Sequence, residues 1–571
     1  MYNRRIKAMA AQSVLLTGEL LHIVFSEFTH QDDLFYCMLV NSLWAMTIVR
    51  LLWKKPIWKT HESYKKWLRT LRSPHTTFNY AKMVNRLSFR PHLRCGREKY
   101  QTSELKYIAN HCQNVKFIEF YCLHGVFEPT NVAMFLKLLP ELVSFSTEDS
   151  WQPALDATLQ SIAEGSCPKL THLEIPGNGD TERCSWILQR IGEHCPKIVM
   201  LKTRWEIRNS KLAQIIVNSF PNLETLICRN VNYDGLKILL PGCRKLKYFE
   251  FTFAIELNDE MAFSISQIFP QLEYFSLRIF GRNNFPRFML SWAQMQTQLR
   301  EIVLSLGEGL TDECFLPITL YCNKLESVTL WWCSGFTDLA FQSLAYNRNV
   351  GLKRLQFYHV KDLTDAGLIA IADNCPRLQE LHLIHCESLT KESLVKIARG
   401  CKSLVTFNAE FCSRRYNWQM TSAFLFTLAN RNRGTLEVLK FNDRNTCISE
   451  VVESYDMNRF DSTLFDRLAK RCPKLRILEL HTYHQETNPN ALFRSLLKFR
   501  NLELLGIYPG ENARRQHLEK LQTHRRLKDV QFYFCNIDDD LKGYYQDQSR
   551  RNRGSLYTKF EPGNFFTTSS E

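Results

Sequence analysis

The chain has 571 residues and a formal net charge of +15, and 45% of its residues are hydrophobic and 12% aromatic. The apolar and aromatic content excludes general disorder, and the length suits one elongated repeat array with a small added module. The charge is uneven, because residues 1–100 hold 17 Lys and Arg against 6 Asp and Glu, whereas the remainder holds 56 against 52. An acidic partner surface near the N-terminus is therefore favoured over nucleic acid.

No targeting or membrane segment is expected. Residues 1–12 are basic and are predicted to be flexible, but they lack the apolar core of a secretory signal. The apolar stretch Leu34–Val49 is too short for a membrane span and is interrupted by Asn41 and Ser42. Because no secretory signal is expected, the 19 cysteines are not expected to form disulfides. A reducing compartment is therefore expected, either the cytoplasm, the nucleus or both.

Three short helices are predicted between residues 15 and 58. The first carries Phe25 among apolar residues at helical spacing, the second begins behind Asp32 and Asp33, and the third carries Trp44. A segment of this length cannot enclose so much apolar surface by itself. A partner is therefore expected to cover part of it.

This stretch resembles the F-box family, although Thr17 stands where that family usually has proline. The resemblance implies an F-box at residues 13–60 that docks onto a Skp-type adaptor and, through it, onto a cullin complex. The alternative is an ordinary helical cap on a repeat array. The residues that match the family motif in order and spacing are Leu16, Glu19, Leu20, Leu21, Ile23, Phe25, Asp33, Leu34, Val40, Trp44, Leu52 and Trp53.

Six of these residues are predicted to form the adaptor contact, each contributing about 1.5–3 kcal/mol when buried. They are Leu16, Leu20, Ile23, Phe25, Val40 and Trp44.

Residues 61–100 are expected to form a linker and the start of a solenoid, and residues 101–540 about 16 leucine-rich repeats. Each repeat reads as a helix, a turn and a short strand written L-x-x-L-x-L, mostly at intervals of 23 to 28 residues. The predicted fold is α/β, a curved solenoid with parallel strands on the concave side and helices on the convex side. The first strand positions are Val115, Leu142, Leu170, Ile198, Leu223, Leu246, Leu272, Leu299, Leu325, Leu352, Leu378, Leu404, Leu436, Leu475, Leu502 and Leu527.

The repeated helices share an apolar stripe that ends in cysteine just before the strand. These cysteines are predicted to be buried free thiols, because no C-x-x-C pair is present to suggest zinc. The cysteine-containing repeats resemble those of F-box proteins with leucine-rich repeats. Thr311, Thr337 and Thr364 are predicted N-caps of the helices that follow them. The cysteines of the clearest helices are Cys112, Cys195, Cys375, Cys401 and Cys472.

Two segments break the rhythm of the repeats. Residues 442–459 are a polar insert, either a binding loop at the rim of the solenoid or a neutral surface insertion. Residues 541–571 show neither the helix nor the strand period and are predicted to be a flexible tail.

No nucleophile elbow, phosphate-binding glycine loop or metal-binding motif appears in the sequence. The chain is therefore expected to be non-catalytic and to need no cofactor and no metal. The two resemblances together imply a substrate-recognition subunit of a Skp–cullin–F-box ubiquitin ligase. The alternative is a leucine-rich-repeat scaffold that binds a Skp-type adaptor outside any ligase. A small-molecule receptor is a third option that no residue pattern supports.

The target is expected on the concave face, to which the third, fifth and seventh strand positions point. Arg204 and Arg229 both occupy a seventh position and are predicted to be near neighbours, which favours an acidic or phosphorylated target segment. The alternatives are a site around Trp331 and Tyr358, the 442–459 insert, or a solvated face with scattered aromatics. The predicted target-binding residues are Lys202, Arg204, Arg229, Tyr274, Arg278, Trp331, Arg354 and Tyr358.

Overall fold

The computed structural model divides into two compact units, Met1–Tyr248 and Phe249–Glu571. It describes residues 18–26, 31–58, 60–89, 100–121, 128–147, 152–175, 181–252, 258–279, 284–305, 309–347, 351–410, 412, 422–442, 462–481, 489–507, 520–521, 524, 526–527 and 529–532. The predictions for residues 1–12, for most of the 442–459 insert and for the 541–571 tail lie outside these residues.

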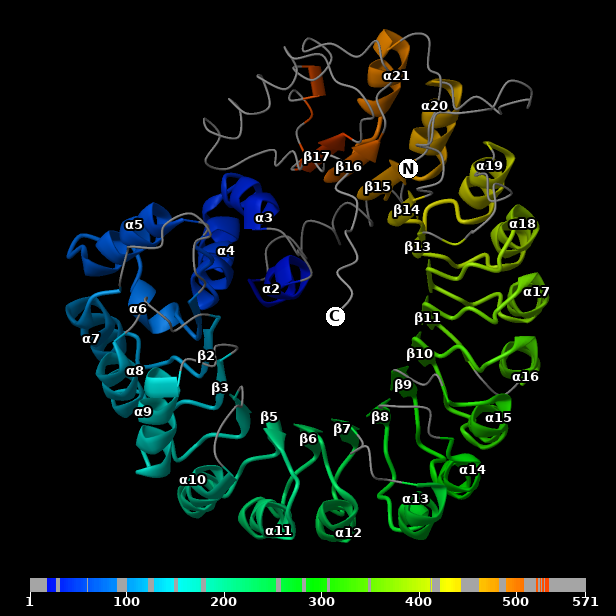
Figure 1. Ribbon diagram of the computed structural model, residues 1–571. Coiled ribbons are helices and arrows are strands. Elements are labelled where there is room, and N and C mark those ends of the chain that lie inside the picture. Colours follow the sequence, from blue (N-terminus) through cyan, green and yellow to red (C-terminus); the bar gives the residue numbers. More distant parts are fainter. Residues whose placement is uncertain are drawn as a thin grey trace, which may run out of the picture. The chain divides into compact units, whose positions relative to one another are not determined.

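The first unit begins with helices only and continues as alternating strands and helices (Figure 1). Strands β1 to β6 pair in parallel in chain order. The elements are α2 (Gly18–Ser26), α3 (Gln31–Met38), α4 (Ser42–Lys54), α5 (His61–Arg72), α6 (Tyr80–Met83), β1 (Arg86–Phe89), α7 (Thr102–His111), β2 (Phe117–Phe120), α8 (Pro129–Lys137), β3 (Ser144–Thr147), α9 (Gln152–Ala163), β4 (His172–Ile175), α10 (Thr181–His194), β5 (Met200–Glu206), α11 (Ser210–Ser219), β6 (Thr225–Arg229) and α12 (Tyr233–Gly242).

The second unit repeats the same strand and helix pattern, and β8 to β17 pair in parallel in chain order. The division between the units falls at the start of β7 (Tyr248–Thr252). The elements that follow are α13 (Asp259–Ser266), β8 (Tyr274–Arg278), α14 (Pro286–Met295), β9 (Glu301–Ser305), α15 (Asp312–Tyr321), β10 (Ser327–Trp331), α16 (Asp338–Tyr346), β11 (Arg354–Tyr358), α17 (Asp365–Asn374), β12 (Glu380–Ile384), α18 (Lys391–Gly400), β13 (Thr406–Glu410), α19 (Ser422–Arg431), β14 (Val438–Asn442), α20 (Ser462–Arg471), β15 (Ile477–His481), α21 (Pro489–Leu496), β16 (Leu504–Ile507) and β17 (Asp529–Phe532).

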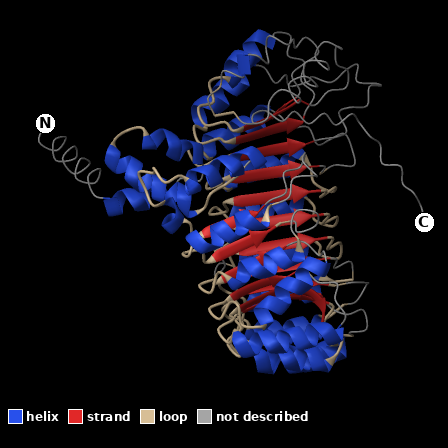
Figure 2. Cartoon of the chain, turned by 90° about the vertical axis from the view of Figure 1, so that its left-hand side faces the viewer, coloured by secondary structure: helices blue, strands red, loops and turns tan. Residues whose placement is uncertain are grey.

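The fold is a leucine-rich-repeat fold, as predicted from the L-x-x-L-x-L pattern. All 16 predicted first positions are followed by a parallel strand, two residues further on in every case. Within each unit the strands line the inner side and the helices the outer side (Figure 1), and neighbouring strand arrows point the same way (Figure 2). In β11, Leu355 and Phe357 are fully buried, and so are Leu368 and Ile371 on the helix that packs behind them. The helical stripe and the alternating strand thus bury each other's apolar faces.

One strand was not predicted. β1 lies inside residues 61–100, the predicted linker and start of the solenoid, and it pairs in parallel with β2. Leu87 and Phe89 are buried in it, and Phe89 stacks on Phe120 with ring centroids 5.1 Å apart. Val84, Leu87 and Phe89 stand at the spacing of the repeat pattern, and the strand begins two residues after Val84, so the signal for this strand is present in the sequence.

Side-chain oxygens join consecutive repeats near the helix starts. Thr311, Thr337 and Thr364 are the N-cap residues of α15, α16 and α17, as predicted, but only the side chains of Thr337 and Thr364 make the capping hydrogen bond. Asp338, at the first position of α16, accepts hydrogen bonds from the Thr364 backbone N–H at 2.9 Å and from the Gly367 N–H at 3.0 Å. This aspartate therefore fixes the start of the next helix.

The five repeat cysteines are buried free thiols, as predicted. Burial raises the pKa of the Cys195 thiol to about 12, and its Sγ donates to the Cys167 carbonyl oxygen at 3.2 Å. Within the described part of the chain, no group of three or more His, Cys, Asp or Glu side chains could hold a metal ion. None of the helices described is long and apolar enough to cross a membrane.

Candidate functional site

Helices α2, α3 and α4 form a small bundle in which α4 packs against both of the others (Figure 1). Its core consists of Leu21, Phe25, Leu34 and Ile48. The Phe25 ring meets the edge of Trp44, with centroids 5.0 Å apart. The start of α4 is held by Asn41, whose side chain accepts from the Trp44 N–H at 2.9 Å.

This bundle exposes more large apolar side chains than it buries. Ile23 on α2 is 59% exposed and Val40, just beyond α3, is 58% exposed. Such surface costs hydration free energy unless something covers it. The other exposed members are Val24, Phe35, Tyr36, Leu39 and Met46, and with Ile23 and Val40 they are called the apolar bundle surface below.

The predicted adaptor residues fall into four groups. Ile23 and Val40 belong to the apolar bundle surface. Phe25 is buried, so the prediction that its side chain contacts a partner is corrected: it supports the surface from beneath. Trp44 is half-buried, and its Nε1–H finds no acceptor among the described residues. Leu16 and the side chain of Leu20 lie outside the described residues.

The bundle continues into the repeats through a cluster of stacked aromatic rings. Trp53, in the last turn of α4, stacks on Tyr80 with centroids 4.1 Å apart, and Trp58 meets the edge of Trp67 at 5.0 Å. The carbonyl oxygen of Lys54 accepts from the backbone N–H that precedes β1. These contacts fix the end of α4 against the first strand of the repeats.

In the first unit, the predicted arginine pair is not formed. β5 is longer than β6, and a register shift between Lys202 and Glu206 places Glu206, not Arg204, opposite Arg229. The prediction that Arg204 and Arg229 are adjacent is therefore wrong, because two additional residues of β5 lie between the paired positions. Both arginines are exposed, and Lys202 forms an ion pair with Glu174.

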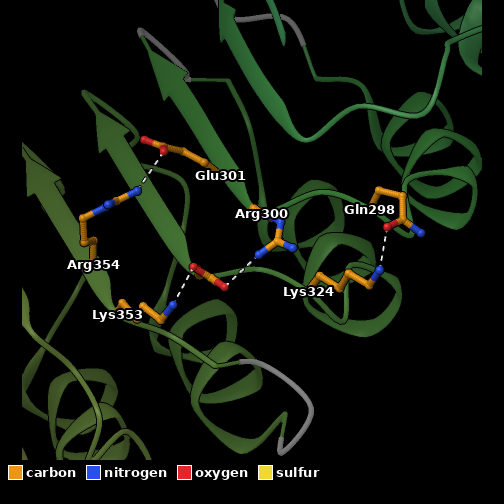
Figure 3. A network of polar contacts seen from close by, with 7 residues as sticks. Gln298, Arg300, Glu301, Lys324, Lys353 and Arg354 are labelled. Atoms are coloured by element: carbon orange, nitrogen blue, oxygen red, sulfur yellow. Dashed lines mark hydrogen bonds and ion pairs between the residues drawn. The ribbon is translucent and has the colours of Figure 1, made fainter. Parts of the chain in front are cut away.

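In the second unit, Arg354 is already paired within the chain. Its guanidinium lies 2.9 Å from a carboxylate oxygen of Glu301 on β9, two strands away, and Figure 3 shows the two side chains pointing toward each other. Glu326 forms ion pairs with Arg300 at 3.1 Å and with Lys353 at 2.9 Å. The hydrogen bond from Lys353 holds the pKa of the Glu326 carboxyl below its usual range. Arg354 therefore contributes to this network before any target binds.

Trp331 and Tyr358 lie opposite each other at the ends of β10 and β11. Their rings are stacked and nearly parallel, with centroids 3.7 Å apart and 3° between the planes. Burial, followed by the charge of Glu410, raises the pKa of the Tyr358 hydroxyl. On β8, Tyr274 at the start of the strand is half-buried, and Arg278 at its end is exposed.

A second ring stack lies one residue further along the same strands, and sequence reasoning missed it. Trp332 stacks on His359 at 3.6 Å, and His359 stacks on His385 at 4.2 Å. All three have a positive φ of 55–57°, and each backbone N–H donates to the last strand residue of the next repeat at 2.8 Å. The signal in the sequence was an aromatic ring directly after each of β10, β11 and β12. The prediction considered only the third, fifth and seventh strand positions.

His359 is neutral at physiological pH. Burial, with the nearby charges of His385 and Lys361, lowers the pKa of its imidazole to about 4. The Trp331–Tyr358 and Trp332–His359–His385 stacks therefore present flat ring surfaces that are suited to binding and not to proton transfer at pH 7.

Comparisons with known proteins give no family. No protein-family model matches the chain. The Tonsoku-like protein of Danio rerio is 32% identical over 102 residues, which is 16% of this chain and only 7% of that protein.

Three solved structures are similar at low identity. The crystal structure of the Rad7 and Elc1 complex in yeast is 15% identical, covers 61% of this chain and 90% of that chain, and has a TM-score of 0.43. The leucine-rich-repeat-containing protein LegL7 from Legionella pneumophila is 13% identical over 50% of this chain and 88% of its own, with a TM-score of 0.31. The TLR13–ssRNA13 complex is 13% identical over 84% of this chain and 62% of that chain, with a TM-score of 0.32. With scores below 0.5, these similarities carry no argument about function.

Proposed function

We propose that the chain is the substrate-recognition subunit of a Skp–cullin–F-box ubiquitin ligase. In this proposal the α2–α4 bundle binds a Skp-type adaptor and the inner face of the repeats binds a target protein. The chain contributes no catalytic group, needs no cofactor, and acts in the cytoplasm or nucleus. Its role is to hold the target where the cullin complex can ubiquitinate it for proteasomal degradation.

The observation that carries the proposal is the apolar bundle surface. Among its described side chains, the bundle of three short helices buries five apolar ones and leaves seven large ones exposed. Burying Ile23 and Val40 against an adaptor would contribute about 1.5–3 kcal/mol each. The resemblance of this stretch to the F-box motif supports the identity of the partner.

The junction to the repeats also suits this role. The Trp53–Tyr80 stack and the backbone bond to Lys54 tie the bundle to β1 within the first unit. A target held on the repeats of that unit would then have a fixed orientation toward the adaptor.

The test is copurification of the full chain with a Skp-type adaptor and a cullin, with Ile23→Asp and Val40→Asp combined in one variant. Charged groups in the contact should reduce adaptor recovery at least tenfold while the repeats remain folded. Leu339→Asp is the matched control, since Leu339 is 54% exposed on a repeat helix. Wild-type recovery of the adaptor by the double variant would contradict the proposal, and adaptor without cullin would favour the non-ligase scaffold.

A further inference from the structure

The seventh strand positions of β8 to β13 form one continuous row in the second unit. The strand registers place Arg278 opposite Ser305, Ser305 opposite Trp331, and so on to Glu410. In order along the inner face, the row reads Arg278, Ser305, Trp331, Tyr358, Ile384 and Glu410.

The two ends of the row carry opposite charges that have no counter-charge among the described residues. Arg278 is exposed and has no ion pair with any other residue described. Glu410 is half-buried and likewise lacks a cationic partner in the described part of the chain; the nearby Lys440 pairs with Glu479 at 3.0 Å. Charges that are held in place but unpaired are suited to a partner that brings the opposite sign at each end.

An acceptor next to Glu410 is also unsatisfied. Asn408, two residues before Glu410 on β13, is only 6% exposed, and its Oδ1 accepts no hydrogen bond from the residues described. It lies opposite His382 on one side and Lys440 on the other, on the face away from the buried Phe407. A buried acceptor without a donor is unfavourable. This oxygen is enclosed by its neighbours, so a guanidinium or ammonium group that arrives at this end of the row meets the Glu410 carboxylate.

The middle of the row is apolar, flat and fixed. One face of Trp331 is covered by Tyr358, while the next residue on its other side is Ser305, whose short side chain covers little of an indole. Trp331 accordingly remains 39% exposed. The Trp332–His359–His385 stack along the strand ends braces the backbone from which these rings project. A surface that is ordered before binding loses little entropy when it is occupied.

We propose that this row binds an extended peptide segment of the target with an acidic residue at one end, a flat apolar residue such as proline or an aromatic in the middle, and a basic residue at the other end. The acidic residue meets Arg278, the central residue lies on Trp331, and the basic residue reaches Glu410. This inference rests on the proposed function, because it names the class of target that the repeats would recruit.

The length of the row sets the length of the segment. Five strand spacings of about 4.8 Å give about 24 Å from Arg278 to Glu410. An extended peptide rises about 3.3 Å per residue, so about seven residues span the row. A single-stranded nucleic acid could also stack on these rings, but its uniform negative charge would be repelled by Glu410.

The experiment is a selection of displayed random decapeptides on the purified full chain, followed by affinity measurements on the selected peptides and on an oligothymidylate. Selected peptides should carry opposite charges about seven residues apart with proline or an aromatic between them. Trp331→Ala should weaken their binding at least tenfold, and Trp331→Tyr, which keeps a ring, less than threefold. Glu410→Arg should change the preferred residue at the basic end to Asp or Glu.

The matched control is Glu392→Arg, an exposed charge reversal on the helix side of the repeats, which should change nothing. Selected peptides without the charge pattern, equal binding by Trp331→Ala, no selection at all, or oligothymidylate binding that Trp331→Ala abolishes would each overturn the proposal. Adaptor copurification through the bundle is measured separately, so failure of the peptide selection is distinguishable from failure of the proposed function.

Discussion

The α2–α4 bundle and the β10–β13 repeats place their apolar side chains in opposite environments. In the bundle, Ile23 and Val40 lie on the surface although the segment is rich in apolar residues. In the repeats, Leu355 and Leu381 are fully buried because each repeat covers the apolar face of the next. The bundle has no such neighbour on its exposed side within the described residues.

The exposed apolar side chains of the two regions differ in how they are ordered. In the repeats, the exposed rings of Trp331 and Trp332 are stacked in register and fixed by backbone hydrogen bonds. In the bundle, the exposed side chains surround a small core without such ordering. The first pattern suits recognition of a particular side chain, and the second suits burial of a broad apolar area.

The largest expected effect comes from opening the repeat core. Leu381→Ala removes a fully buried side chain from β12 and should lower the free energy of unfolding by about 2–5 kcal/mol, since neighbouring atoms cannot fill the space. Urea unfolding followed by circular dichroism measures it. Leu320→Ala, at an exposed position on α15, should change it by less than about 0.5 kcal/mol. Equal losses of unfolding free energy in the two variants would contradict the tight packing of the repeat core.

The next effect comes from the contact between repeats at the helix starts. Asp338→Ala removes the acceptor for the Thr364 and Gly367 N–H groups and should cost about 1.5–3 kcal/mol in the same urea experiment. Asp373→Ala removes an exposed carboxylate from the end of α17 and serves as the control. A loss below 0.5 kcal/mol for Asp338→Ala would mean that apolar burial alone joins these repeats.

A smaller effect depends on pH. Because the pKa of His359 falls from its ordinary 6.5 to about 4 in the folded chain, the unfolded chain binds the proton more readily between these values. The stability associated with neutral His359 is complete above pH 6.5 and is lost as the pH falls toward 4. His359→Asn, which tolerates the left-handed backbone, should reduce the drop in Tm between pH 7.5 and pH 5. The same drop in His359→Asn and in the exposed-site control His75→Asn would contradict the assignment.

The smallest effect is expected on the apolar bundle surface. Val40→Ser should change the free energy of unfolding by less than about 0.5 kcal/mol, because Val40 is already exposed to water. Ile48→Val, in the bundle core, should cost about 0.5–1.5 kcal/mol by the same measurement. A larger cost for Val40→Ser would show that the surface is covered within the chain and would contradict the docking proposal.

The sequence by itself determined the repeat. Each strand from β2 to β17 begins where the L-x-x-L-x-L pattern places it, and the cysteines at the helix ends are buried as their position predicts. The caps at Thr337 and Thr364 follow from the same local rules. These features depend on the chain's own periodicity, since a strand buries every second side chain and a helix one stripe, whichever repeat lies beside it.

Only the tertiary structure decided which side chains meet across repeats. The shift in β5 places Glu206 opposite Arg229, and the registers of β10 to β12 stack Trp332, His359 and His385 on one another. It also buries Phe25, one of the expected contact residues, beneath the bundle surface. The physical reason is that a neighbour on the next strand is fixed by pairing register and turn length. Two additional residues in one strand therefore change every cross-strand partner beyond them without disturbing the apolar pattern that the sequence displays.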